Sequence, residues 1–285
     1  MRRRESFARR FVARETAAEA IQVARELERQ GLGVIFDYLG EHVGTTGAAT
    51  AATAEYVRAI EEIRQAGIGR HLSVKLSQLG LEVDRATSID NLRRVLEAAG
   101  QAGFFVRIDM EGSKYTSATI DAFDTLWRIG HRNAGVAIQA YLRRSPADVE
   151  RAIQEGFSVR LVKGAYREPR DVAYQHKHEV DAAFVTLMMA LLERGHEPAV
   201  ATHDDDAIAA TIRFAEDNGI AKDRFAFEML YGVRRDLQTR LAGEGYTVRV
   251  YLPFGQQWFA YFMRRLGERP ANVGFVLKSV LRESV

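Results

Sequence analysis

Short apolar segments alternate with amphipathic ones along nearly the whole chain, and this alternation restricts the fold more than any other feature of the sequence. The apolar segments are compact and rich in β-branched and aromatic residues, as expected for parallel strands covered on both faces. They lie at Gly33–Leu39, His71–Leu76, Phe104–Met110, Gly135–Tyr141, Ser158–Lys163, Ala199–His203, Phe225–Met229 and Thr247–Leu252. Eight such strands at intervals of about 30 residues predict a (β/α)8 barrel of the TIM type.

The stretches between these strands show the periodicity of helices that bury one face. Examples are Thr53–Gln65, Ser88–Ala99 and Asp206–Asp217. Gly31, Gly67 and Gly195 stand where helices should end before the next strand. Thr16 and Glu19 have the spacing of a capping box, which predicts that a helix begins there.

No linker or change of composition divides the chain, so we expect one barrel domain over residues 33–285 after an N-terminal helical arm over residues 1–32. A doubly wound sheet is the alternative, but it normally carries a glycine-rich phosphate turn after a strand. The nearest pattern, Gly67-Ile68-Gly69, precedes a strand and lacks the third glycine, and GxxxxGK[ST] does not occur. The sequence therefore favours the barrel.

Composition and charge exclude several classes of protein. The 285 residues include 40 Lys and Arg against 38 Asp and Glu, a balance too even to make nucleic acid the expected partner. The absence of cysteine excludes disulfides, thiolate metal sites and cysteine nucleophiles. No apolar run approaches the roughly 18–20 residues needed to cross a bilayer. We expect a cytoplasmic protein whose arginine-rich residues 1–14 contact the inner face of a membrane at most peripherally.

Polar residues stand at the end of every predicted strand, and barrel enzymes place their active sites at these ends. The residues are Asp37, Tyr38, Lys75, Asp109, Glu111, Gln139, Lys163, His203, Asp204, Glu228 and Tyr251. Their mixed charges suit a small zwitterionic or anionic substrate better than a metal held by carboxylates. His176 and His178 are two residues apart and are expected on different sides of a helix, and no HxH or HxxxH pattern ends a strand. We therefore predict no metal site.

Lys75 and Lys163 leave another chemistry open. Burial in apolar strands would lower the pKa of a lysine, and a neutral lysine can form a Schiff base. However, Gly164 and Ala165 follow Lys163, and small residues there let backbone N–H groups approach a phosphate or a ring system. A Schiff-base lyase stays an alternative. So does a non-catalytic protein whose basic N-terminus binds a membrane or nucleic acid with steep salt dependence.

The segment after the last predicted strand carries a cluster of aromatic and charged residues. Tyr261, Arg264, Arg265 and Glu268 share one face of a helix with Trp258. Two guanidinium groups among aromatic residues indicate a site that binds a carboxylate, because guanidinium and carboxylate form bidentate pairs.

Nine motifs in this order resemble the proline dehydrogenase family of the monofunctional bacterial type. These flavin enzymes oxidise L-proline to Δ1-pyrroline-5-carboxylate. The motifs are RFVARET at 10–16, DYLGE at 37–41, SVKL at 73–76, IDMEGS at 108–113, RLVKGAY at 160–166, ATHD at 201–204, FEMLYG at 227–232, YLPFG at 251–255 and YFMRRLGERPAN at 261–272.

The resemblance implies a distorted barrel that binds FAD non-covalently at its carboxyl-terminal rim. It implies that Arg264 and Arg265, helped by Lys75, hold the proline carboxylate, and that Asp109 orders this cluster. Residues expected to pack against the pyrrolidine ring are Ala165, Tyr166, Leu230, Tyr251 and Tyr261. Residues expected to line the flavin are Gln139, Arg160, Lys163, Gly164, Ala165, Thr202, His203, Glu228 and Glu268.

A cofactor is also what the chemistry requires, because oxidation of a saturated C–N bond needs a hydride acceptor that no side chain supplies. The cations Arg160 and Lys163 would then stabilise the reduced, anionic flavin. We further expect electrons to pass to a quinone or another acceptor rather than to NAD. Because 285 residues leave no room for a second dehydrogenase domain, we expect a separate pyrroline-5-carboxylate dehydrogenase to take the product.

Overall fold

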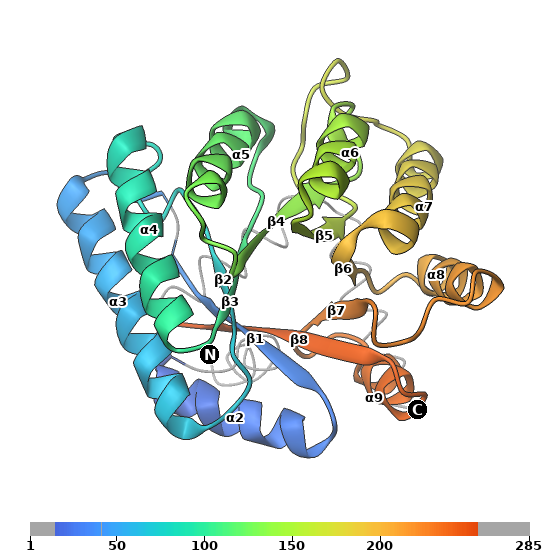
Figure 1. Cartoon of the computed structure of the whole chain (residues 1–285), viewed down its shortest axis with the longest axis horizontal. Helices are drawn as coiled ribbons and strands as arrows, with labels where there is room; N and C mark the ends of the chain where they lie inside the picture. Colours follow the sequence, from blue (N-terminus) through green and yellow to red (C-terminus); the bar gives the residue numbers. More distant parts are fainter. Residues whose placement is uncertain (1–14, 41, 256–285) are drawn as a thin grey trace, which may run out of the picture.

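Eight parallel strands close into a barrel in the computed structural model, which describes residues 15–40 and 42–255 (Figure 1). Each strand pairs with its neighbours in chain order, and the first pairs with the last. The strands are β1 Gly33–Tyr38, β2 His71–Val74, β3 Phe105–Ile108, β4 Ala134–Gln139, β5 Ser158–Val162, β6 His196–Ala201, β7 Ala226–Leu230 and β8 Thr247–Phe254. The predicted barrel is confirmed. Its one register shift in the described pairings lies between β5 and β6.

Helices surround the strands (Figure 1). They are α2 Ala17–Arg29, α3 Thr46–Ala66, α4 Arg85–Gln101, α5 Ser113–Arg128, α6 Ser145–Glu155, α7 Lys177–Arg194, α8 Asp205–Asp217 and α9 Arg235–Gly243. The predicted helix ends at residues 31, 67 and 195 are confirmed within one or two residues, although Gly195 has extended rather than left-handed backbone. The capping box of Thr16 and Glu19 is present at the start of α2.

The main apolar core lies between the strands and the helices. Along β2 and β3, Leu72, Val74, Val106 and Ile108 belong to this core, and the polar residues between them point into the barrel. Helix α2 adds buried residues such as Ile21 to the same core and contacts β1 and β8. The boundary between arm and barrel at residue 33 stays a prediction.

The alternation of side chains along each strand gives the barrel a polar interior. A residue two positions before an inward-facing residue also faces inward. Ser73 therefore faces inward before Lys75, and Arg107 before Asp109. This interior, rather than the apolar core outside the strands, positions the candidate site.

Candidate active site

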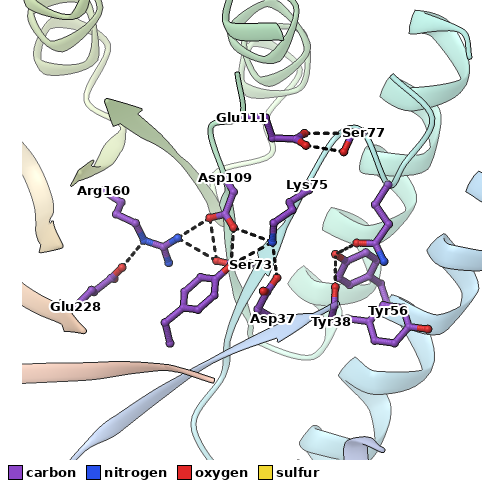
Figure 2. Close-up of polar contacts among 12 residues, drawn as sticks. Asp37, Tyr38, Tyr56, Ser73, Lys75, Ser77, Asp109, Glu111, Arg160 and Glu228 are labelled. Atoms are coloured by element: carbon purple, nitrogen blue, oxygen red, sulfur yellow. Dashed lines mark hydrogen bonds and ion pairs between the residues drawn. The ribbon is translucent and has the colours of Figure 1, made fainter. Parts of the chain in front are cut away.

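A row of side chains of alternating charge crosses the barrel interior (Figure 2). The row runs from Glu228 through Arg160, Asp109 and Lys75 to Asp37, and it links residues from five strands or strand ends. All but Asp109 are buried almost completely. Because a buried charge is costly unless it is paired, this row forms only if every member has partners of opposite charge.

Lys75 follows the last residue of β2 and is 3% exposed. Its Nζ lies 2.7 Å from Oδ1 of Asp37, 3.2 Å from the hydroxyl oxygen of Tyr251 and 3.3 Å from Oδ2 of Asp109. An ammonium group has three donors, so these three oxygen atoms satisfy it.

The expectation that burial lowers the pKa of Lys75 is wrong. Burial alone would lower it, but the carboxylate of Asp37 and the neighbouring Tyr251 and Asp109 outweigh burial and hold the pKa well above its ordinary value. Lys75 is therefore a permanent cation, whereas a Schiff-base lysine must be neutral. The lyase alternative loses its support at this residue.

Arg160, from the middle of β5, is fixed at two of its three nitrogen atoms. Its Nε donates to Oε2 of Glu228. Its Nη1 donates to Oδ1 of Asp109 at 2.5 Å and to Oγ of Ser73 at 3.1 Å. The third nitrogen, Nη2, is buried and has no hydrogen-bond partner among the described residues. The guanidinium is thus held in one orientation with one donor group left over.

Tyr251 of β8, the strand between β7 and β1, contacts the middle of the row. Its hydroxyl donates to Oδ2 of Asp109 at 2.6 Å and accepts from Lys75. Burial would raise the pKa of Asp109, but Lys75, Arg160 and the hydrogen bond from Tyr251 lower it. The carboxylate of Asp109 therefore stays ionised, and it orders both cations beside it. The role expected for Asp109 toward Arg264, Arg265 and the substrate stays a prediction.

Glu111 and Gln139 form a second buried group above the row (Figure 2 shows Glu111). The carboxylate of Glu111 accepts from the backbone N–H of Ser77 at 3.0 Å and from its hydroxyl at 2.5 Å. Gln139, the last residue of β4, donates from Nε2 to the carbonyl of Glu111 at 2.9 Å. These bonds tie together the loops that follow β2, β3 and β4. The amide nitrogen of Gln139 is used by this contact.

The loop after β5 begins with Lys163 and Gly164. The Nζ of Lys163 contacts Asp181 of α7 and lies 2.6 Å from Oδ2 of Asp204. Gly164 has a φ of +117°, and a Cβ there would come within 2.3 Å of the ring of Tyr141. Only glycine fits this position, so the loop that carries Ala165 and Tyr166 leaves the strand in a fixed direction.

Thr202 and His203 follow β6, beside the end of β7. The Nε2 of His203 accepts from the backbone N–H of Leu230 at 2.8 Å. Burial, with a smaller contribution from Arg234, lowers the pKa of His203 to about 4, so its ring is neutral. Thr202 is buried, and its Oγ1 accepts from the backbone N–H of Asp204 at 3.1 Å. The bond between His203 and Leu230 links the segment after β6 to the end of β7.

Four of the predicted site residues, Tyr261, Arg264, Arg265 and Glu268, lie outside the described residues. The predicted carboxylate site of two arginines therefore stays a prediction. One expectation about the histidines is wrong: the rings of His176 and His178 stack with centroids 5.7 Å apart, because His176 is the N-cap of α7 rather than a residue within the helix. Among the described residues, no group of three or more His, Asp or Glu side chains could hold a metal ion.

Sequence reasoning named Asp37 only as a polar strand end and missed Ser73, Arg107 and Arg249 altogether. Arg249 approaches Glu228, with 3.7 Å between Nη1 and Oε1. Arg107 donates from Nη1 to the backbone carbonyl of Ser158 at 2.7 Å. Arg249 stands two positions before Tyr251, and Arg107 stands two positions before Asp109; both later residues were predicted site residues. The period of two along a strand was the signal that could have found them.

A charged row inside the carboxyl half of a closed parallel barrel defines a barrel enzyme for a small charged substrate. In the part of the chain that the structure describes, no helix is both long and apolar enough to cross a membrane.

Comparisons with known proteins identify the family. The model of the proline dehydrogenase family matches residues 20–278. The proline dehydrogenase of Deinococcus radiodurans is 41% identical over 281 residues, which are 97% of this chain and 91% of that protein. Proline dehydrogenase 1 of Bacillus subtilis (strain 168) is 40% identical and is covered to the same extents, 97% and 91%. This chain belongs to the proline dehydrogenase family, and it is an oxidoreductase of proline catabolism.

The fold agrees with a solved structure. Proline utilization A (PutA) from Bdellovibrio bacteriovorus, in a crystal structure inactivated by N-propargylglycine, superposes with a TM-score of 0.86 at 27% identity. The match covers 92% of this chain and 32% of that longer chain. The barrel described here therefore corresponds to about a third of that protein.

Proposed function

We propose that this chain oxidises L-proline to Δ1-pyrroline-5-carboxylate with non-covalently bound FAD as its cofactor. Membership of the family supports the substrate and the reaction. The observation that carries the proposal is the geometry of Arg160. Its buried guanidinium is oriented by two carboxylates, and one of its NH2 groups has no hydrogen-bond partner among the described residues. Such a group suits a ligand with hydrogen-bond acceptors, and a flavin ring is such a ligand.

A bound flavin would supply the hydride acceptor that the chain itself lacks. The chain would position the substrate. Arg264 and Arg265 would hold the proline carboxylate. Lys75 would help by its permanent charge, because its three donors already have partners. Residues that would pack against the pyrrolidine ring are Ala165, Tyr166, Leu230, Tyr251 and Tyr261.

The cofactor would lie against the carboxyl ends of β4 to β7. The residues proposed to line it are Gln139, Arg160, Lys163, Gly164, Ala165, Thr202, His203, Glu228 and Glu268. Three contacts within the chain bear on these roles. His203 is neutral and turns Nε2 toward Leu230, the Nζ of Lys163 lies between two carboxylates, and the conformation of Gly164 fixes where the loop after β5 begins.

We also propose that electrons pass from the flavin to a membrane quinone, and that a separate pyrroline-5-carboxylate dehydrogenase consumes the product. A cytoplasmic protein that contacts the membrane only peripherally would fit both steps. Family membership supports these assignments. Stopped-flow mixing of the proline-reduced protein with a water-soluble quinone, and in parallel with NAD⁺, would test the acceptor. Fast reoxidation by the quinone alone is the expected result.

A visible absorption spectrum, recorded before and after anaerobic addition of L-proline, tests the main proposal. We expect flavin bands that bleach with proline and do not bleach with D-proline. A protein that binds FAD but keeps its colour with L-proline would contradict the assigned substrate. A protein that binds no FAD would contradict the assigned cofactor.

A further inference from the structure

We propose that Glu228 is a positioning residue, which orients Arg160 and sets how much positive charge Arg160 presents to the bound flavin. The inference rests on the proposed function, because it concerns the environment of that cofactor. Glu228 would act through Arg160, which it contacts with Oε2. Arg249 joins the site because it approaches the other carboxylate oxygen of Glu228, Oε1.

Two hydrogen bonds fix the orientation of Arg160. Arg160 is 4% exposed and extends from β5 across the barrel, where Nε meets Glu228 of β7 and Nη1 meets Asp109 after β3 (Figure 2). A planar guanidinium held at Nε and Nη1 cannot rotate about its Cδ–Nε bond without breaking both contacts. The direction of Nη2, which has no hydrogen-bond partner within residues 15–40 and 42–255, is therefore set by two carboxylates, and Glu228 is one of them.

Glu228 also acts on Arg160 electrostatically. Glu228 is 4% exposed and lies between two guanidinium groups, with Oε2 toward Arg160 and Oε1 toward Arg249. Burial would raise the pKa of Glu228, but Arg160, Arg107 and Arg249 together lower it, so its carboxylate is ionised. Glu228 therefore offsets part of the charge of Arg160, and Arg249 offsets part of the charge of Glu228.

Arg107 shows how strongly positive this part of the interior is. It is buried on β3, and burial together with the nearby Arg160 and Arg249 lowers its pKa to about 9, although Glu228 acts in the opposite direction. Two guanidinium groups thus contact Glu228, and a third, that of Arg107, acts on it electrostatically. Removal of that single negative charge should change the local field more than removal of any exposed carboxylate, because buried charges are screened least.

The reduction potential of the bound flavin measures this field, since positive charge near the isoalloxazine favours the reduced form. Glu228→Gln keeps an oxygen acceptor for Nε of Arg160 but removes the charge. We expect the ratio of reduced to oxidised flavin to rise about tenfold, a shift of ~+30 mV for a two-electron couple. Arg249→Gln frees Glu228 to offset Arg160 more fully, so the potential should shift in the negative direction.

The experiment is a spectroscopic redox titration of the FAD-loaded wild type and variants, with steady-state kinetics in parallel. Because Glu228 acts on the cofactor through Arg160, and not on the substrate, kcat should change in Glu228→Gln while KM for proline stays within about twofold. Asp124→Asn is the matched control. Asp124 is also a buried carboxylate bound to an arginine, Arg151, but it lies on α5 outside the barrel. The reduction potential of the flavin in Asp124→Asn should therefore equal that in the wild type.

Opposite shifts in the two variants would support the inference, since a purely structural role predicts lower stability without a signed change in potential. Unchanged potentials, or shifts of the same sign, would overturn it. If Glu228→Gln does not fold, Arg249→Gln decides the question alone, and an unchanged potential in that variant overturns the inference. A wild type that binds no FAD would instead overturn the proposed function, and the inference with it.

Discussion

Lys75 and the carboxylates around it show how much a single buried charge depends on its partners. Replacement by methionine would leave Asp37 and Asp109 buried without their shared cation. Removal of one partner of a buried ion pair costs about 3–5 kcal/mol, so Lys75→Met should lower the free energy of unfolding by that amount. Urea denaturation measures it.

The control for this substitution is Lys177→Met. Lys177 also contacts two aspartates, Asp181 and Asp204, but its side chain is 78% exposed. Exposed pairs contribute about 0–1 kcal/mol, so this variant should differ little from the wild type. If Lys75→Met and Lys177→Met lowered the free energy of unfolding equally, the ion pairs of the interior row would contribute no more to stability than exposed pairs do.

His203 predicts a particular dependence of stability on pH. Its pKa in the folded chain is about 4, below the ordinary value of 6.5. Between these pH values the unfolded chain binds a proton that the folded chain does not, so stability is present above about pH 6.5 and is lost as the pH falls toward 4. His203→Gln, which can still accept from the N–H of Leu230, should remove about 2–3 kcal/mol of this dependence between pH 7.5 and 4.5.

Unfolding by urea at several pH values between 4.5 and 7.5 tests this prediction. The partly buried His71 has a similarly low pKa of about 4 and should contribute equally in both proteins. The difference between wild type and variant therefore isolates His203. Parallel stability curves over the whole range would contradict the assignment of a neutral, buried ring.

At the scale of secondary-structure elements, the sequence predicted the strands better than the helices. Residues of every predicted strand lie in an observed one, because parallel strands buried on both faces leave compact apolar runs. Helix α3 begins at Thr46, whereas its amphipathic pattern starts near Thr53. The residues between are mostly alanine, glycine and threonine, which carry no hydrophobic periodicity. The predicted start of β6 was also late, since the observed strand begins at His196, before the apolar run.

The site could be predicted only in part, for a similar reason. Polar residues at strand ends identified Lys75 and Asp109, because barrel geometry brings those ends together whatever the register. The sequence could not show that Arg160 contacts Glu228 rather than another carboxylate. That pairing depends on the stagger of β5 against β7 across the barrel, and stagger is a property of the closed sheet.

The loop after β5 gives a prediction about an element junction. In Gly164→Ala the new Cβ would overlap the ring of Tyr141, and a φ of +117° is strained for any L-residue. We expect a loss of about 2–4 kcal/mol of stability, together with weaker binding of FAD because the loop is displaced. Thermal unfolding and a fluorescence titration with FAD measure the two effects.

Gly156→Ala separates the steric effect from the backbone effect. Gly156 ends α6 with a φ of +72°, and a Cβ there would meet nothing within 4 Å. This variant should lose only about 1 kcal/mol and should bind FAD as the wild type does. If the two variants lost the same stability, the contact with Tyr141 would not be the reason for glycine at position 164.

At the scale of the whole molecule, the barrel encloses charges that are balanced mostly by one another. Two polar atoms of the row, Oδ2 of Asp37 and Nη2 of Arg160, are buried without a hydrogen-bond partner among the described residues. Each such atom costs about 1–3 kcal/mol relative to a satisfied one. A ligand that supplied partners would therefore stabilise the entire barrel, because all eight described strands unfold together if the closed sheet opens.

FAD should accordingly raise the melting temperature of this chain in a concentration-dependent way. A ligand that binds only the folded state adds about 2.7 kcal/mol at a concentration of 100 Kd, which for a domain of this size corresponds to roughly 5–10 °C. Differential scanning calorimetry over a range of FAD concentrations measures the shift. NAD⁺ shares the ADP portion of FAD but lacks the isoalloxazine. At equal concentrations it should therefore produce a much smaller shift in melting temperature. Equal shifts with both nucleotides would mean that the adenine end dominates binding, and that the interior row does not stabilise the flavin.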